Sequence, residues 1–365
     1  MKDLGAVRLA LVYAGCFLGA GYVSGQELWQ FFGVYGKYGY AGLLLAMALL
    51  GFFGVLMLLT ARKMGDDDMD HVVIPWQIPW LHSALGVLEC VFFFGVIAIM
   101  NAGVGAMAEQ LFLIPHALTS AVFCALVLLI ALLGLRGLAS AFSVSVPLLV
   151  ICTVLFGIIA VKENGFVLAA APVIAESKSL LGCWLVGAVV YASYNIFGAF
   201  GIVIPFAGHV RGKRTVYAGI GLGTVLLALI AMSVLLSLHA LPAAAEAELP
   251  MLYCAERQGS SLAYGYAFLL LLAMFGTSLS CLVGMVEYLE LKRPRLKTRH
   301  GVFVAVLLFL AYLAGLFGFG DLIGVIYPVF GYAGAAFLLC LLVQGIRQRK
   351  ASAGSKKAPV GSKND

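Results

Sequence analysis

Charged residues are scarce in this 365-residue chain: Asp, Glu, Lys and Arg make up only 11% of it, whereas an ordinary soluble domain holds roughly 25%. Hydrophobic residues make up 63%, and apolar stretches of about 18 residues or more recur along almost the whole length. This composition excludes a water-soluble fold. It predicts one all-α integral membrane domain over residues 1–346 and a basic, disordered cytoplasmic tail over 347–365.

The motifs of catalysis and cofactor binding are also missing. Eight cysteines are present without a CxxC pair for a metal or redox site. The sequence has no phosphate-binding Walker loop, no HExxH and no convincing hydrolase motif. We therefore expect neither an enzyme nor a cofactor. The net charge of +6 could suggest nucleic acid, but the basic residues stand in short runs between apolar spans, as topology signals do.

The apolar pattern predicts ten membrane-spanning helices. We place them at 6–33, 38–61, 83–113, 116–135, 138–161, 183–208, 215–240, 261–290, 301–319 and 322–345. With a cytoplasmic N-terminus, 19 of the 23 Lys and Arg residues fall inside and four fall outside. The four are Lys37, Lys162, Lys178 and Arg257. The positive-inside rule thus predicts a multi-pass plasma-membrane protein with both termini in the cytoplasm.

Two of these spans carry polar residues and glycines near mid-membrane, where unwound backbone survives only if it is buried in protein or lines a polar cavity. The first has four glycines between Gly15 and Glu27, and the sixth has polar groups, glycines and a proline between Tyr191 and Pro205. Because spans one and six are five apart, we expect a 5+5 inverted repeat over about 6–161 and 183–345, with both leading helices discontinuous. Close helix packing through small residues would also explain the glycines.

The run Ala14-Gly15-Cys16-Phe17-Leu18-Gly19-Ala20-Gly21 resembles the unwound first helix of sodium-coupled amino acid transporters with the LeuT fold, whose usual form is A-G-N-x-x-G-x-G. Its continuation to Glu27 is still more similar to the YkvI-type membrane proteins, amino acid permeases of the broad amino acid–polyamine–cation superfamily. The YkvI-like match covers the whole chain in length and span count. The motif similarity to LeuT is confined to spans one and eight.

The resemblance in span eight, from Met274 to Ser280, implies a sodium site. Its ligands would be the carbonyls of Gly15, Leu18 and Met274 and the hydroxyls of Thr277 and Ser278. Cys16 stands where the family has the Asn that supports a second sodium, so we expect one coupling ion. Alternatively, both hydroxyls bond back within their helix or to a neighbouring one.

The candidates for a solute pocket come from the first, third and sixth spans. They are Gly19, Gly21, Tyr22, Asn101, Tyr194, Asn195 and Gly198. The sixth span can be aligned on either Asn195 or Gly198, and the Asn101 amide could instead bond between helices.

Glu27 is an ionisable residue in a predicted span, and a charge at mid-membrane costs about 2.5–3.5 kcal/mol on insertion scales. We expect it to pair with a substrate amine, gate the outer pathway or carry a coupled proton, unless it simply faces external water. The sequence thus predicts an ion-coupled secondary transporter, with sodium as the coupling ion, that carries a small amino-acid-like solute by alternating access within the lipid bilayer. Proton coupling through Glu27 and a ligand-sensing receptor on the same scaffold are the alternatives, and the oligomeric state stays open.

Overall fold

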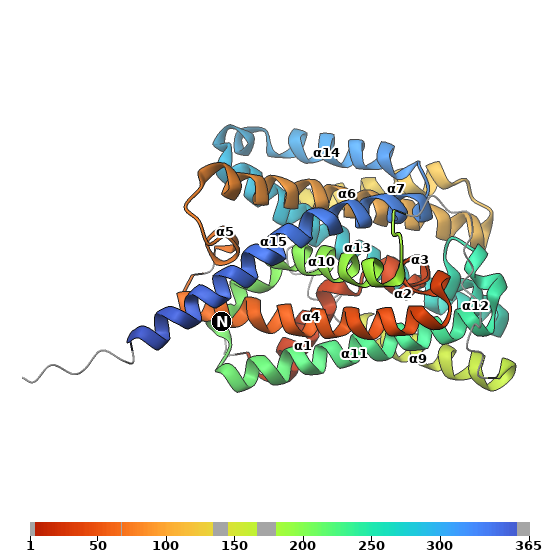
Figure 1. The fold of residues 1–365 in the computed structure, drawn as a ribbon. Coiled ribbons are helices and arrows are strands. Elements are labelled where there is room, and N and C mark those ends of the chain that lie inside the picture. The colour runs from red at the N-terminus through yellow and green to blue at the C-terminus, as the bar shows by residue number, and fades with distance from the viewer. Residues whose placement is uncertain (1–3, 67, 134–144, 166–179, 356–365) are drawn as a thin grey trace, which may run out of the picture.

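The computed structural model describes residues 4–66, 68–133, 145–165 and 180–355, which form helices joined by short turns (Figure 1). The longer helices are α4 (Lys37–Met64), α6 (Pro79–Phe112), α7 (His116–Leu132), α9 (Ser145–Asn164), α10 (Trp184–Val203), α11 (Lys213–Ala240), α13 (Ser260–Lys292), α14 (His300–Gly315) and α15 (Phe319–Ser355). The shorter ones are α1 (Ala6–Phe17), α2 (Ala20–Ser24), α3 (Gln26–Phe31), α5 (Met69–Val73) and α12 (Pro250–Gln258), with 3₁₀ turns η1 (Gly33–Tyr35), η2 (Ile204–His209), η3 (Pro242–Glu246) and η4 (Pro294–Arg299).

Eight helices in the described ranges are long and apolar enough to cross a membrane, in agreement with a multi-pass membrane protein. The expected spans at 6–33 and 116–135 correspond to the shorter apolar helices Ala6–Phe17 and His116–Leu132. The fifth expected span starts outside the described residues, and α9 covers its remainder. The total of ten spans and the inverted repeat stay predictions.

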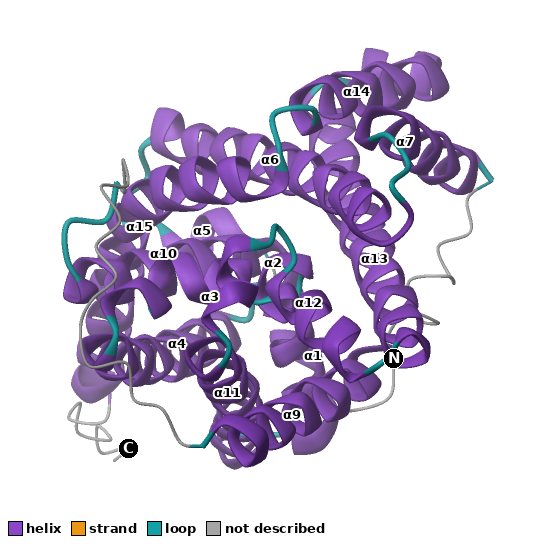
Figure 2. Ribbon diagram, turned by 90° about the vertical axis from the view of Figure 1, so that its right-hand side faces the viewer, coloured by secondary structure: helices purple, strands orange, loops and turns teal. Residues whose placement is uncertain are grey.

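The helices are arranged around a buried centre. Figure 2 shows α2 and α3 inside a ring of longer helices, with α7 and α14 outside it. Along the ring, α10 packs lengthwise against α15 and α4, α1 against α11, and α13 against α6. The chain starts at the same end of the bundle at which α15 finishes (Figure 1). We call this the N-terminal end and the opposite one the far end. At the N-terminal end the Leu4 amide donates to the His209 carbonyl over 2.8 Å.

α15 stays helical to Ser355, past residue 347 where the predicted tail begins. Its last turns are anchored by Arg347, whose guanidinium donates to the Pro75 carbonyl over 2.6 Å and lies 5.4 Å from the Trp76 ring centre. Residues 356–365 of the expected tail lie outside the described part.

The break in the first span is confirmed, and it is double. α1 ends at Phe17 and α2 begins at Ala20, with Leu18 at φ −78°, ψ 53° between them. A second interruption follows at Gly25, whose φ of +87° is in the left-handed region that glycine alone adopts without strain. The first break was predicted from the glycines, whereas the second was not.

The predicted break in the sixth span is wrong, because α10 runs unbroken from Trp184 to Val203. Its polar side chains satisfy themselves within the helix: Ser193 Oγ donates to Val189 O and Asn195 Nδ2 to Tyr191 O, four residues back in each case. Its glycines make room for α6, since a Cβ on Gly198 would lie 2.4 Å from the Phe92 ring. In α10 the glycines therefore allow close packing of the helix against α6, which was the alternative explanation, and do not mark a break.

Candidate functional site

The interruption at Leu18 and Gly19 exposes backbone groups in the middle of the bundle. The Leu18 amide donates to Ala14 O and the Gly19 amide to Phe17 O, so the helical pattern stops. Within the described part of the chain, the carbonyl oxygens of Gly15 and Leu18 accept no backbone hydrogen bond. Leu18 is buried and Gly15 is exposed, so water or a cation can supply the missing partner of these oxygens.

Gly15 and Leu18 border a cavity of about 740 Å³, which we call the central cavity. It is lined by residues from α1, α6, α10, α13 and α15. It begins between Leu4 and Arg8 at the N-terminal end and reaches inward to Glu27, Tyr194 and Tyr327. The break in helix one is therefore accessible from the end of the bundle where the chain starts.

Glu27 lies at the inner end of the central cavity and is only 3% exposed. The Tyr194 hydroxyl donates a short hydrogen bond to its Oε1. A Cβ on Gly21 would lie 2.7 Å from its Oε2, so the absence of a side chain at residue 21 makes space for the carboxylate. No lysine, arginine or histidine among the described residues forms an ion pair with Glu27. A buried carboxylate of this kind must be protonated or must receive a cation from outside the protein.

Aromatic rings form one wall beside this carboxylate. Tyr194 stacks on Tyr327 with ring centres 4.5 Å apart and planes at 9°. Phe92 also lines the cavity, with its ring centre 6.4 Å from that of Tyr194 and 6.3 Å from that of Tyr327. Ring faces attract organic cations, and aromatic side chains also stack on aromatic solutes.

The structure brings eight of the predicted site residues together on the central cavity. They are Gly15, Leu18, Gly19, Glu27, Tyr194, Asn195, Gly198 and Thr277. Of the predicted sodium ligands, Gly15, Leu18 and Thr277 thus border one space. Ser278 and Met274 are absent from its lining, although the Ser278 hydroxyl is fully buried and makes no hydrogen bond.

Three predicted solute contacts lie away from the cavity. Tyr22 is fully buried and donates to Leu227 O over 2.6 Å, so it fastens α2 to α11. Asn101 is fully buried beside α14, where a Cβ on Gly315 would lie 2.9 Å from its Nδ2. Gly21 acts behind the Glu27 carboxylate, as described above. None of the three lines the central cavity in this structure, and their contact with a solute stays a prediction.

Two residues near the site were missed. Tyr327 lies in a long apolar span without a motif, so its only signal is being a tyrosine among aliphatic residues. Glu89, in α6, is 3% exposed, and its carboxylate accepts a hydrogen bond from the Gly201 amide over 2.9 Å. Because Gly201 lines the central cavity, this second carboxylate supports its wall.

Hydrogen bonds close the far end above Glu27. Gln30 Nε2 donates to Gly320 O over 2.9 Å, which joins α3 to the first turn of α15. The Phe319 amide donates to Glu248 Oε2 over 3.2 Å, and the Tyr266 hydroxyl to Val23 O over 2.6 Å. Among the described residues, none of these six lines the central cavity.

Comparisons with known proteins agree with this arrangement. The chain matches no protein-family model. It is 24% identical over 352 residues to the uncharacterized membrane protein YkvI of Bacillus subtilis (strain 168), covering 94% of this chain and 97% of YkvI. It is 25% identical over 347 residues to the uncharacterized protein YyaD of the same organism, covering 93% of this chain and 97% of YyaD.

Two solved structures share the fold. MhsT in complex with L-phenylalanine superposes with a TM-score of 0.64 at 17% identity, over 94% of this chain and 93% of MhsT. The inward-facing conformation of Mhp1 also gives 0.64, at 14% identity, over 92% of this chain and 76% of Mhp1. The chain therefore has the LeuT fold that its first span resembles, and it is similar to YkvI over almost its whole length.

Proposed function

We propose that the chain is an ion-coupled secondary transporter of a small amino-acid-like solute. The observation that carries this proposal is the central cavity, which connects the N-terminal end with a broken helix and a buried carboxylate. Beyond that carboxylate, hydrogen bonds join α3 to α15 and α13 to α2. Alternating access requires a midplane site open to one side at a time. With the expected orientation, this state is open to the cytoplasm.

The site chemistry supports a solute that carries an ammonium group. Glu27 offers a negative charge with no cationic partner in the described part, and the rings of Tyr194, Tyr327 and Phe92 stand beside it. An ammonium would neutralise the carboxylate and face the rings. The fold shared with MhsT, which was captured with L-phenylalanine, supports an amino acid in particular.

Sodium is the first candidate for the coupling ion. Gly15, Leu18 and Thr277 border one cavity, and the Ser278 hydroxyl is buried without a partner among the described residues. Oxygen ligands of this kind suit a hard cation. Proton coupling is the second candidate, because a buried carboxylate held by a tyrosine hydroxyl can exchange a proton as its surroundings change.

Uptake into proteoliposomes tests the proposal. A mixture of radiolabelled amino acids is offered under an inward sodium gradient at equal pH, or under a pH gradient without sodium. Accumulation driven by the sodium gradient supports sodium coupling, and accumulation driven only by the pH gradient supports proton coupling. Binding of a ligand that is never accumulated under either gradient would make the protein a receptor and end the transport proposal.

Substitutions then separate the coupling site from the solute site. Thr277→Ala with Ser278→Ala should raise the sodium concentration for half-maximal uptake roughly tenfold or more, since each lost ligand contact with a charged group is worth about 1.5–3 kcal/mol. Ser233→Ala is the matched control, because that hydroxyl bonds only within its own helix. An unchanged sodium response in the double variant would remove the sodium assignment.

A further inference from the structure

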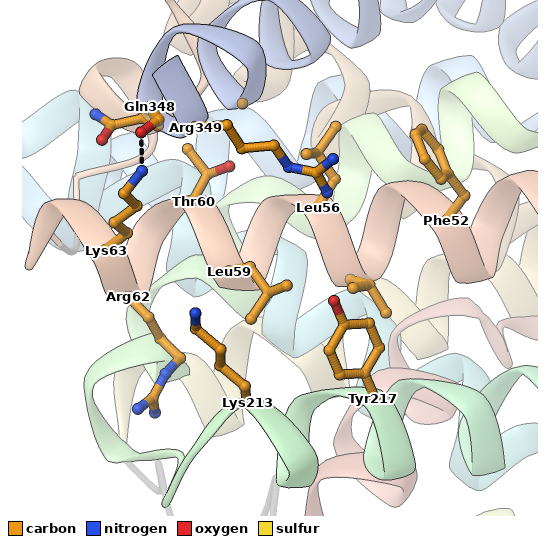
Figure 3. A pocket seen from close by; sticks show the side chains of 12 residues that line it. Phe52, Leu56, Leu59, Thr60, Arg62, Lys63, Lys213, Tyr217, Gln348 and Arg349 are labelled. Carbon is orange, nitrogen blue, oxygen red and sulfur yellow. Dashed lines mark hydrogen bonds between the residues drawn. The ribbon is translucent and has the colours of Figure 1, made fainter. Parts of the chain in front are cut away.

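A second hollow lies on the outer surface of the bundle, away from the central cavity (Figure 3). It has a volume of about 660 Å³ and lies between α4, α11 and the last turns of α15. Four of its twelve lining residues are basic, and none is acidic. The four are Arg62, Lys63, Lys213 and Arg349. We call this hollow the basic groove.

The four cations come from three helices. In Figure 3, Lys213 points from α11 toward α4, and Arg349 extends from α15 along α4 over Leu56. Lys63 donates to the Gln348 carbonyl and Arg62 to the Ala207 carbonyl over 3.4 Å, contacts that leave both positive charges uncompensated. None of the four pairs with a carboxylate in the described residues. The groove therefore concentrates positive charge at the N-terminal end.

The floor of the groove is apolar and continues deeper into the membrane span. A neighbouring hollow of about 450 Å³ between α4 and α11 shares Phe52, Val55 and Tyr217 with it. This second part reaches Ala48 on α4 and Ala228 on α11. Phe52 and Tyr217, at the junction, are 52% and 55% exposed. Their rings face the surroundings of the protein, which in a membrane are lipid.

The length of the combined groove matches one lipid leaflet. From Lys63 to Ala48 the helix α4 rises by about 22 Å at 1.5 Å per residue, and half of a bilayer with its headgroups is about 20–22 Å thick. The cations thus lie at headgroup level and the apolar part at acyl-chain level. Polar and apolar parts follow each other in the order in which a phospholipid presents them.

We propose that this groove binds one anionic phospholipid from the leaflet at the N-terminal end. Its phosphate lies among Lys213, Arg349 and the end of α4, and one acyl chain lies along Gly51 and Gly221 between α4 and α11. A zwitterionic lipid would place the positive charge of its headgroup beside the four basic side chains of the groove, which would repel it. Anionic lipids are also those that basic pockets at the cytoplasmic ends of membrane helices hold.

Native mass spectrometry of the full chain in detergent tests the site, with phosphatidylglycerol and phosphatidylcholine titrated separately. We expect one phosphatidylglycerol to be retained at concentrations at which phosphatidylcholine is lost. Lys213→Gln with Arg349→Gln should weaken phosphatidylglycerol binding about thirtyfold, at roughly fivefold for each basic side chain. Lys297→Gln with Arg299→Gln is the control, because it removes two charges from exposed η4, outside the groove.

A second variant tests the acyl-chain part without changing charge. A Cβ on Gly221 would meet nothing within 4 Å, so Gly221→Leu fills the groove without a clash in its own fold. Gly265→Leu is its control, since Gly265 is also helical and open but lies outside the groove. Gly221→Leu should weaken phosphatidylglycerol retention, and Gly265→Leu should leave it unchanged.

Several results would overturn the proposal. Equal retention of phosphatidylglycerol and phosphatidylcholine would do so. So would a loss of phosphatidylglycerol binding in the η4 control as large as that in the Lys213 and Arg349 double variant. Displacement of phosphatidylglycerol by millimolar inorganic phosphate, with no effect of Gly221→Leu, would make the ligand a soluble anion. Loss of a dimer in the groove variants without any lipid retention would make the occupant a second copy of the chain.

Discussion

At the scale of single residues, Gly19 and Gly21 show how differently two glycines of one break can act. A Cβ on Gly19 would meet nothing within 4 Å, whereas one on Gly21 would lie 2.7 Å from Glu27 Oε2 and 3.3 Å from Ile323. Gly19 leaves an open passage, and Gly21 sets the position of the carboxylate. The two positions therefore form a matched pair for substitution.

We predict that Gly21→Ala lowers uptake roughly tenfold, because the methyl group displaces the carboxylate and crowding of this kind costs about 1–3 kcal/mol. Gly19→Ala should keep most of the activity, since its φ of −74° suits alanine. Initial rates in proteoliposomes at equal protein content measure both. Equal losses in the two variants would contradict the role assigned to Gly21.

Asp70, in α5 between the expected spans, gives a prediction about pH. Burial first, and the charge of Asp68 second, raise the pKa of Asp70 above its usual value. A raised carboxyl pKa means that folding disfavours the ionised form, so the stability tied to this proton is present at low pH and lost as the pH rises. Asp70→Asn should raise the melting temperature by a few degrees at pH 7 and by less at pH 4. Tryptophan fluorescence on heating measures this, and an equal gain at both pH values would refute it.

At the scale of elements, the second interruption of helix one depends on Gly25. This glycine has a φ of +87°, and a Cβ there would lie 3.1 Å from both Met251 and Val234. It lets α3 leave the line of α2 and meet the far-end contacts. The angle between α2 and α3 therefore depends on the backbone conformation of Gly25.

We predict that Gly25→Ala destabilises the protein by about 1–2 kcal/mol from the left-handed backbone alone, with an added cost from the crowded Met251 and Val234. Gly265→Ala, at an open helical position, should instead gain up to about 1 kcal/mol from helix propensity. Denaturation in the same detergent compares them. A loss in the control as large as that of Gly25→Ala would remove the special role of Gly25.

The helices themselves could be predicted from the sequence, because runs of apolar residues must be long enough to cross a bilayer and basic residues mark their ends. The break at Gly19 could be predicted as well, since glycines there coincide with a recognisable motif. The unbroken α10 could not: Ser193 and Asn195 bond to carbonyls of their own helix, and residue types alone do not distinguish that from unwinding. The position of Tyr327 on the central cavity and the direction of Tyr22 toward α11 depend on how each helix is rotated about its axis. A uniformly apolar span does not encode that rotation.

At the scale of the whole molecule, the central cavity opens at the N-terminal end and a set of hydrogen bonds closes the far end. Cys16 lines the open part, while Cys183 is exposed where α10 begins, at the opposite end from Val203 and η2. Two native thiols thus report on the two ends of the bundle.

We predict that a membrane-impermeant maleimide labels Cys16 from the cytoplasmic side and Cys183 from the outside. Variants that keep only one of these cysteines, in vesicles of known orientation, provide the measurement. Saturating solute and coupling ion should slow labelling of Cys16 by filling or closing the cavity and should leave Cys183 unaffected. Labelling of both thiols from one side would contradict the orientation.

The volume of the central cavity also has an osmotic consequence. At about 30 Å³ for each molecule of liquid water, a space of about 740 Å³ accommodates roughly 25 waters. Under the proposed alternating access, closing this end would return that water to the compartment that the N-terminal end faces, apart from the share replaced by solute. Osmolytes too large to enter the cavity would favour the closed form, so crowding on the side of the N-terminal end would shift the equilibrium between the open and closed forms.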